Sequence, residues 1–343
     1  MRITAAVAGA SGSVGGELLR LICGHPLLEL GPLTAEANAG VPVTDVHPDL
    51  ARLAGRVFEP SDPERLASAD LVFLALPVGG SARTVPGLPD SLRVVDVAND
   101  FRLADPAAWT RYYGTPHAGT WCYGLPELPG RRSLVTAGNR VASPGCYATA
   151  SILGLAPLVT AGLAEPSDIV ITAALGTSGV GRAGGSGPRA SEVLDALRAY
   201  RVGGEHGTVP EVEQELTALA GTPATVSFTP MLAPMPRGIL AICSIRLSGG
   251  ATTGELRAAL AAAYTDEPFV RLLPEGRWPS TGAVAGSNAA HLQVASDPRA
   301  GRAVVLVAID NLGKGGAGQA LQNANLMLGL PEEAGLTTGG VAP

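Results

Sequence analysis

One of the four cysteines stands where thiol chemistry is favoured. Cys146 lies in the segment Ser143-Pro144-Gly145-Cys146-Tyr147-Ala148-Thr149, directly before an apolar helical stretch at Ala150–Leu158. The pattern places Cys146 at or near a helix N-terminus, where unpaired amides and the helix dipole stabilise a thiolate and lower the pKa of the thiol. Such a thiol is a competent nucleophile at neutral pH. Cys146 is therefore the candidate nucleophile.

The other cysteines have settings typical of structural residues. Cys23 falls within a helical pattern, Cys243 within a strand pattern, and Cys122 follows a tryptophan in a Gly/Pro-rich loop. No Cys-x-x-Cys and no paired Cys/His spacing of the zinc type occurs in the sequence. The sequence therefore predicts neither a metal site nor a disulfide framework.

Acyl transfer to a thiol also requires donors for a developing oxyanion. A glycine-rich stretch, Gly176-Thr177-Ser178-Gly179-Val180-Gly181-Arg182, follows a strand pattern. Its amides and hydroxyls suit an anion, and Arg182 is placed to clamp a phosphate or carboxylate. Ser178, Gly179 and Arg182 are therefore predicted to bind substrate, with a plain flexible loop as the alternative.

A thiol route also needs a proton donor and acceptor. The five histidines are His25, His47, His117, His206 and His291. His206 is the best candidate because it lies in a loop just before a helix whose first turn carries Pro210 and Glu211. A surface role for this loop histidine is the alternative.

A nucleotide-binding loop is predicted near the N-terminus. The segment Gly9-Ala10-Ser11-Gly12-Ser13-Val14-Gly15 separates a predicted strand from a predicted helix. Glycines permit tight turning and close backbone approach, and the helix N-terminus offers free N–H groups to a diphosphate. We expect Gly9, Ser11, Gly12, Ser13 and Val14 to contact a dinucleotide, with a purely structural turn as the alternative.

The residues after the second predicted strand leave the choice of dinucleotide open. Glu36 lies where an NAD site carries an acid that binds the ribose hydroxyls, and its carboxylate would repel a 2′-phosphate. Thr34 and Asn38 can instead donate hydrogen bonds to that phosphate if Glu36 points away. The residues therefore permit NAD or NADP.

Two domains must position these residues. Strand patterns at Ile3–Ala8, Leu28–Thr34, Asp70–Leu76 and Arg93–Val97 alternate with helical patterns, which predicts an α/β domain with a parallel, doubly wound sheet. The later pattern predicts a second, mixed α+β domain, with strands at 169–174, 224–228, 238–246 and 303–308 and helices at 190–200, 209–220 and 253–264. A helical tail at Gly315–Gly329 is expected to return to the first domain. The predicted boundaries are 1–145 with 312–343, and 146–311.

Composition limits the classes of partner. The 343 residues are 46% hydrophobic and 16% charged, as in globular proteins, and the net charge is −6. An acidic chain without clustered basic residues is not expected to bind nucleic acid. No apolar run approaches the ~18 residues of a membrane span. With no targeting segment recognised, the cytoplasm is the expected location.

Together these motifs resemble one family. The chain is similar to N-acetyl-γ-glutamyl-phosphate reductase, a relative of aspartate-semialdehyde dehydrogenase, over essentially its whole length. The matching motifs are Gly9-Ala10-Ser11-Gly12, Ala75-Leu76-Pro77, Asp100-Phe101-Arg102-Leu103, Tyr123-Gly124-Leu125-Pro126-Glu127-Leu128, Pro144-Gly145-Cys146-Tyr147, Gly176-Thr177-Ser178-Gly179, Pro236-Arg237-Gly238, Gly286-Ser287-Asn288-Ala289 and Ala308-Ile309-Asp310-Asn311-Leu312.

The resemblance implies a reaction. Cys146 would form a thioester as phosphate leaves an acyl phosphate, and NADPH would reduce this thioester to a semialdehyde in arginine biosynthesis. Oligomers of the family are commonly tetramers, so a homodimer or homotetramer is expected. The matches also imply substrate contacts at Arg102, Glu211 and Arg237 and cofactor contacts at Leu76, Pro77, Gly179 and Asn311.

Departures from the family pattern cluster near the expected site. Where the family reads His-x-His-Thr-Pro-Glu, this chain keeps His206 but has Thr208 at the second histidine. Proton transfer would then fall to His206 or water. Val78 replaces a further histidine, and Ser143 stands where asparagine is common. These changes leave two alternatives: a paralogue that reduces a related acyl phosphate, or a catalytically impaired NADP-binding protein.

Overall fold

The chain folds into two compact units. The structure, a computed structural model, describes residues 2–180 and 196–341. Residues 2–144 and 316–336 form the N-terminal unit, and residues 145–180, 196–315 and 337–341 form the catalytic unit. Arg182, which was predicted to clamp an anion, lies outside the described residues. In the part of the chain that the structure describes, no helix has the length and apolarity to span a bilayer.

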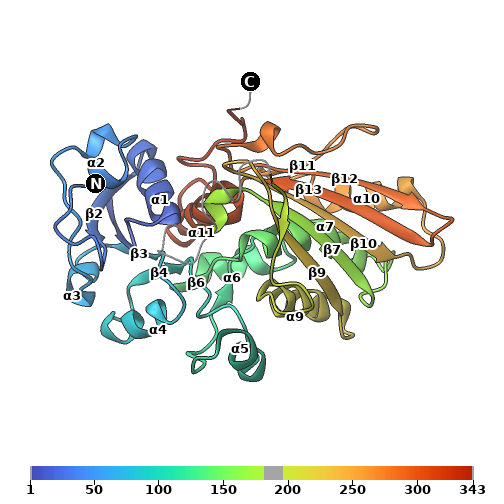
Figure 1. The fold of residues 1–343 in the computed structure, drawn as a ribbon, viewed down its shortest axis with the longest axis horizontal. Helices are drawn as coiled ribbons and strands as arrows, with labels where there is room; N and C mark the ends of the chain where they lie inside the picture. Colours follow the sequence, from blue (N-terminus) through green and yellow to red (C-terminus); the bar gives the residue numbers. More distant parts are fainter. Residues whose placement is uncertain (1, 181–195, 342–343) are drawn as a thin grey trace. The chain divides into compact units, whose positions relative to one another are not determined.

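The described part of the N-terminal unit contains a six-stranded parallel sheet in the order β2-β1-β3-β4-β6-β5 (Figure 1). Its strands are β1 (Ile3–Ala8), β2 (Leu28–Thr34), β3 (Leu71–Leu74), β4 (Arg93–Asp96), β5 (Cys122–Tyr123) and β6 (Arg140–Ala142). Its helices are α1 (Ser13–Gly24), α2 (Val43–Val46), α3 (Pro63–Leu66), α4 (Gly80–Thr84), α5 (Pro106–Tyr113), α6 (Arg131–Ala137) and α11 (Gly318–Met327). The order runs outward in both directions from β1, and such switch points bind ligands at the carboxyl ends of the strands.

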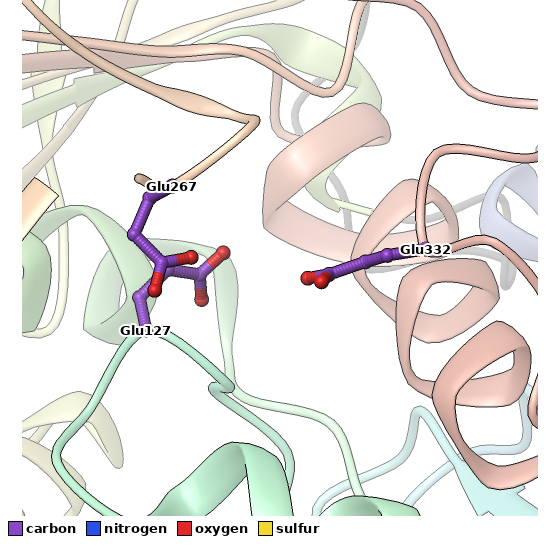
Figure 2. Close-up of side chains that lie close together, drawn as sticks. All are labelled: Glu127, Glu267 and Glu332. Atoms are coloured by element: carbon purple, nitrogen blue, oxygen red, sulfur yellow. The ribbon is translucent and has the colours of Figure 1, made fainter. Parts of the chain in front are cut away.

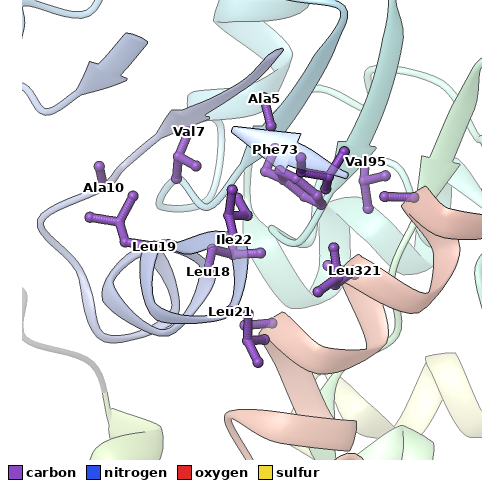
Figure 3. Close-up of a cluster of buried hydrophobic side chains, with 14 of the residues drawn as sticks. Ala5, Val7, Ala10, Leu18, Leu19, Leu21, Ile22, Phe73, Val95 and Leu321 are labelled. Carbon is purple, nitrogen blue, oxygen red and sulfur yellow. The ribbon is translucent and has the colours of Figure 1, made fainter. Parts of the chain in front are cut away.

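Both faces of this sheet are buried. Alternate residues such as Val7 and Phe73 pack against Leu18, Ile22 and Leu321, from α1 and α11 (Figure 3). Their neighbours along β1 and β3 join a second cluster on the opposite face, which includes Ala6, Ala8, Val72 and Leu74. This double burial explains why the strands are near-continuous apolar runs.

Polar contacts fasten the C-terminal segment to the N-terminal unit. Gln322 Nε2 donates to Oε1 of Glu127 at 2.9 Å and to Oε1 of Glu332 at 2.8 Å. Figure 2 shows these two carboxylates. Arg132 forms an ion pair with Glu332. The two acidic groups of the N-terminal unit thus link α11 and the residues after it to the segment that follows β5.

The described part of the catalytic unit contains a mixed sheet in the order β11-β12-β13-β10-β7-β9-β8 (Figure 1). Its strands are β7 (Ile169–Leu175), β8 (Arg198–Ala199), β9 (Val226–Leu232), β10 (Ile239–Arg246), β11 (Val270–Leu272), β12 (Ala290–Asp297) and β13 (Arg302–Ile309). Its helices are α7 (Cys146–Thr160), α9 (Thr208–Ala220) and α10 (Thr253–Tyr264).

Helix α7 packs on one face of this sheet. It contacts β10 and β13, and its Gly154 lies against Val305 and Val307. The β10 residues of this face, such as Cys243, are fully buried, whereas Ile242 on the opposite face is 39% exposed. Burial on alternate residues is the pattern of a sheet with one helix-covered face.

The predicted fold class is confirmed, although individual elements differ from the prediction. The helix predicted at 190–200 is wrong in its described part, because Arg198 and Ala199 form β8 and pair antiparallel with β9. Pairing with a sheet edge overrides the helical propensity of this short segment. Strand β12 was not predicted, although its alternation of Leu292 and Val294 with more polar residues is a strand signal.

Candidate active site

Cys146 is the first residue of α7, which confirms the predicted helix start. Gly145, the N-cap residue, has an extended backbone and no side chain to cap the helix. Its N–H donates to Oε1 of Glu211 at 2.7 Å, and its carbonyl accepts from the N–H of Thr149 at 2.8 Å. Glu211 is buried in the first turn of α9. Its carboxylate therefore positions the segment that carries the thiol.

Gly315 packs against the base of the Cys146 side chain. It lies in a single π-helical turn, Gly313–Ala317, directly before α11. An ideal Cβ at Gly315 would lie 2.7 Å from Cβ of Cys146 and 3.3 Å from its Cα. The N–H of Gly315 donates to the carbonyl of Asp310 at 2.9 Å. The turn therefore brings a residue without a side chain against the candidate nucleophile, and π-turns are frequent at functional sites.

Asp310 joins several segments of the catalytic unit. Its buried carboxylate accepts from Nε and Nη2 of Arg237, at 2.8 and 3.0 Å. It also accepts from the backbone N–H groups of Leu312, Gly313 and Gly286, at 2.8, 3.0 and 2.6 Å. Arg237, predicted to bind substrate, thus has one edge of its guanidinium group on Asp310 while its side chain is 26% exposed.

The loop that follows β7 pairs with the loop that precedes β10. The N–H groups of Gly176, Thr177 and Ser178 donate to the carbonyls of Gly238, Met235 and Pro236, and the N–H of Gly179 donates to that of Gly176. Pairing within the chain already uses the donors of these four amides, so this geometry gives no support to their predicted role as donors to an anion.

The structure brings two predicted site residues together at this loop. Asn311 Nδ2 donates to the hydroxyl oxygen of Ser178 at 3.0 Å, and Asn311 Oδ1 accepts from the N–H of Gly238 at 2.7 Å. The Ser178 hydroxyl therefore remains a candidate donor to substrate. The amides of Tyr147 and Ala148, in the first turn of α7, donate to no group among the described residues.

Aromatic side chains surround His206. Its ring meets those of Tyr147, Tyr200 and Phe228 edge to face, with centroids 5.2 to 5.7 Å apart. Its Nδ1 accepts from the N–H of Thr208, the first residue of α9, at 3.1 Å. Burial, with the nearby charge of Arg201, lowers the pKa of His206 to about 4. The imidazole is therefore neutral at pH 7, with its proton on Nε2.

Two tyrosine hydroxyls adjoin this group. The Tyr200 hydroxyl donates to the Tyr147 hydroxyl at 3.2 Å, and the Tyr147 hydroxyl donates to the carbonyl of Met231 at 3.3 Å. Burial raises the pKa of Tyr200 to about 12 and also raises the pKa of Tyr147, and negative charge on Cys146 contributes to both increases. Both hydroxyls therefore stay protonated and are electrostatically coupled to the thiol.

The glycine-rich loop of the N-terminal unit follows β1 closely. The N–H groups of Gly9 and Ala10 both donate to the carbonyl of Thr34 at 3.0 Å. Gly9 has φ +77°, and a Cβ there would lie 2.2 Å from the carbonyl oxygen of Ala75. Among the described residues, the N–H groups of Ser11, Ser13 and Val14 donate to no other group of the chain. This cluster of unpaired donors fits a diphosphate.

Other predicted cofactor residues border this loop or β2. Leu76 lies 3.5 Å from the ideal Cβ position of Gly9, and Pro77 accepts from the N–H of Gly80 at 2.8 Å. Thr34 is fully buried and contacts the loop through its carbonyl. Asn38 is half-buried, in the turn after β2.

Arg102 is buried within the N-terminal unit. Its Nε donates to the carbonyl of Ser143 at 2.7 Å, its Nη1 to Oδ1 of Asn99 at 2.7 Å and its Nη2 to the carbonyl of Val97 at 2.9 Å. Each guanidinium nitrogen thus donates to a group of the chain, and the side chain links the ends of β4 and β6. The substrate contact of Arg102 that the resemblance implies stays a prediction.

Sequence reasoning did not single out Asp310, Gly315 or Tyr200. A buried acid at the end of an apolar strand, followed by a run of glycines, was an available signal for Asp310 and Gly315. Tyr200 fell inside the incorrectly predicted helix, so its hydroxyl was not considered.

Two family models match the chain. The semialdehyde dehydrogenase NAD binding domain matches residues 4–135, and the semialdehyde dehydrogenase dimerisation domain matches residues 146–311. Two solved structures share the fold: aspartate semialdehyde dehydrogenase II complexed with ASA from Vibrio cholerae (TM-score 0.68, 16% identity, covering 96% of this chain and 98% of that one) and aspartate semialdehyde dehydrogenase with NADP from Candida albicans (TM-score 0.68, 18% identity, covering 96% and 99%).

Relatives with a higher sequence identity to this chain than these solved structures share one name. The chain is 59% identical to N-acetyl-gamma-glutamyl-phosphate reductase of Acidothermus cellulolyticus, over 98% of each chain. It is 57% identical to the protein of the same name from Frankia casuarinae and 55% identical to that from Streptomyces coelicolor, over 100% of each chain. With Cys146 heading α7, the chain belongs to the N-acetyl-gamma-glutamyl-phosphate reductase family of semialdehyde dehydrogenases.

Proposed function

We propose that the chain is an N-acetyl-γ-glutamyl-phosphate reductase. It would convert N-acetyl-L-glutamyl 5-phosphate and NADPH into N-acetyl-L-glutamate 5-semialdehyde, NADP⁺ and phosphate, as a cytoplasmic step of arginine biosynthesis. The observation that carries the proposal is Cys146 as the first residue of α7, in a chain 59% identical to a relative of that name.

The thiol performs the covalent chemistry in this proposal. The Cys146 thiolate attacks the acyl carbon, so that a C–S bond forms, the C–O bond to phosphate breaks and phosphate leaves. When bound, a dinucleotide would supply the hydride that reduces the thioester to a tetrahedral adduct on Cys146. Collapse of the adduct breaks the C–S bond and releases the aldehyde and the thiolate. The amides of Tyr147 and Ala148 and the hydroxyl of Ser178 are the donors that we assign to the developing oxyanion.

His206 has a fixed tautomer that determines its role. Because Thr208 N–H occupies Nδ1, the neutral ring can donate from Nε2 but cannot accept a proton at Nδ1 without losing this bond. We therefore assign His206 to hydrogen-bond donation to substrate or oxyanion, and proton exchange to water. The replacement of the family's second histidine by Thr208 is consistent with this assignment.

The remaining predicted contacts divide between substrate and cofactor. Arg237, held on one edge by Asp310, is our candidate for a substrate phosphate or carboxylate, and its backbone lies against Gly176 in the loop after β7. We propose NADP(H) as the dinucleotide, held at Ser11, Gly12, Ser13 and Val14. Asn38, in the turn after β2, would hold the 2′-phosphate, and Glu36 is exposed to solvent.

A second copy of the chain is the partner that the catalytic unit suits. The sheet face opposite α7 carries apolar residues, among them Val170 and Ile242, each 39% exposed. Apolar side chains on adjacent strands are typical of an interface with another chain. The match of residues 146–311 to a dimerisation domain supports a homodimer formed through this face, alone or within a tetramer.

The reverse reaction provides the test. Purified protein is given N-acetylglutamate semialdehyde, phosphate and either NADP⁺ or NAD⁺, and reduced dinucleotide is followed by absorbance. We expect turnover that depends on phosphate and prefers NADP⁺, and that a Cys146→Ser variant loses. Turnover only with an analogue of different chain length or acyl group would identify a paralogue. Dinucleotide binding without turnover on any of them would identify an impaired protein.

A further inference from the structure

A buried histidine lies beneath the glycine-rich loop. His47 follows α2 directly and is only 3% exposed. Its Nε2 lies 2.9 Å from the carbonyl oxygen of Ala10, the second residue of the loop. Because a carbonyl oxygen can only accept, Nε2 carries the proton and donates.

Helix α1 leaves space for this imidazole. A Cβ at Gly16, in the first turn of α1, would lie 2.3 Å from Cε1 of His47 and 2.6 Å from Nδ1. Phe58 meets the ring edge to face on another side, with centroids 6.1 Å apart. A glycine in a helix is less favourable than alanine by roughly 1 kcal/mol. The space that the imidazole needs explains why a glycine stands at position 16 in spite of this cost.

The hydrogen bond also sets the direction of a donor. In a planar trans peptide the C=O and N–H bonds point in opposite directions. The carbonyl of Ala10 points toward His47, so the N–H of Ser11 points away from it. Among the described residues this N–H donates to no other group of the chain. His47 therefore orients one of the unpaired donors of the loop.

We propose that His47 is a positioning residue for the dinucleotide. It holds the Ala10–Ser11 peptide so that the Ser11 N–H faces the diphosphate, without touching the cofactor itself. This inference rests on the proposed function, because it needs a dinucleotide at the loop. Loss of the histidine would allow the peptide to rotate, so binding would have to restore its orientation at the expense of affinity.

Three substitutions act on this contact in different ways. His47→Leu removes the donor and keeps an apolar side chain in the space, whereas His47→Gln places an amide N–H near the position of Nε2. Gly16→Ala leaves His47 in the sequence but displaces its ring. His25 provides the matched control, because it is also buried in the N-terminal unit and contacts Asn325, Leu27 and Leu28, outside the loop. Gly24→Ala controls for the alanine, since a Cβ there meets nothing within 4 Å.

The readouts are the Kd for NADPH, measured by fluorescence titration, and the melting temperature without ligand. We expect His47→Leu and Gly16→Ala to raise Kd by about tenfold, the value of one lost hydrogen bond. His47→Gln should recover most of the affinity, and His25→Leu and Gly24→Ala should leave Kd unchanged even if the melting temperature falls. An unchanged Kd in folded His47→Leu, or equal losses in His25→Leu, would overturn the inference while the proposed function stands. Failure of the unaltered protein to bind NADPH would overturn both.

Discussion

The Cβ that an alanine would add at Gly315 lies 2.7 Å from the Cβ of Cys146, closer than two carbon atoms can approach without displacement. The candidate nucleophile therefore has its position set by a residue 169 positions later in the chain (315 − 146). Any side chain at 315 must move the thiol, the π-turn or both.

Gly315→Ala should reduce turnover by about a hundredfold, because a displacement near 1 Å at a reacting atom has effects of that order. The rate of alkylation of Cys146 by iodoacetamide should change as well. Gly254→Ala, in the same unit, is the control, since its new Cβ would have only the Thr252 hydroxyl at 3.9 Å. Equal activity of the two variants would show that the crowding has no effect on catalysis.

Glu211 provides a second test of how α7 is placed. Glu211→Ala leaves the Gly145 N–H without its acceptor, a loss of about 1–3 kcal/mol for a buried group. Glu211→Gln keeps an acceptor oxygen, so kcat should fall in the alanine variant and largely recover in the glutamine variant. Glu213 lies on the same helix as Glu211 and accepts a hydrogen bond from the N–H of Val226. Glu213→Ala, which removes this acceptor, is therefore the matched control. A glutamine variant as inactive as the alanine variant would indicate that the negative charge itself is needed.

The lowered pKa of His206 leads to a prediction of how the stability of the protein depends on pH. Its folded-state pKa of about 4 lies below the ordinary value of 6.5, so the unfolded chain binds more protons between these values. The free energy of unfolding must then rise with pH through this window. The contribution of His206 to stability is lost as the pH falls toward 4. Urea unfolding from pH 4.5 to 7.5 should show a shallower rise for His206→Gln than for the unaltered protein. Parallel curves would contradict the shifted pKa.

For Asp96 we expect stability to change with pH in the opposite direction. Burial raises its pKa from 3.8 to about 7, partly offset by the Ser81 hydroxyl that donates to Oδ1 at 2.6 Å. The folded chain therefore binds the extra proton, and this contribution to stability is lost as pH rises through 7. Relative to the unaltered protein, Asp96→Asn should become more stable as pH increases from 5 to 8 in urea titrations. A pH-independent difference between the two proteins would refute the assignment.

A positive charge on the exposed face of the catalytic sheet should weaken the proposed homodimer. Ile242→Lys puts a cation among apolar residues that we assign to the homodimer, so the variant should sediment as a smaller species. Glu165→Lys, outside the strands of this sheet, is the control for an added positive charge. If the Ile242→Lys variant kept the mass of the unaltered assembly, this face would be excluded as the homodimer interface.

The sequence predicted elements well where burial determines the pattern. The bounds of β1 and β2 agree with the residues expected, because each strand lies between glycine-, proline- or polar-rich segments. The helix start at Cys146 was predictable because Pro144 and Gly145 end the preceding strand and the next residues are apolar. Long-range contacts were not predictable in this way. Nothing near Gly315 indicates that Cys146 will pack against it, and the pairing that uses the amides of Thr177 and Ser178 depends on a loop 58 residues later (235 − 177).

The carboxylate of Asp310 accepts five hydrogen bonds, two from Arg237 and three from backbone N–H groups. A carboxylate offers about four lone-pair positions, so all of them are engaged within the chain. Asp310 consequently has no electron pair left with which to abstract a proton during turnover. Inactivity in an Asp310 variant would then report collapse of the surrounding loops, and a survey of acidic residues by activity alone would misassign it as a general base.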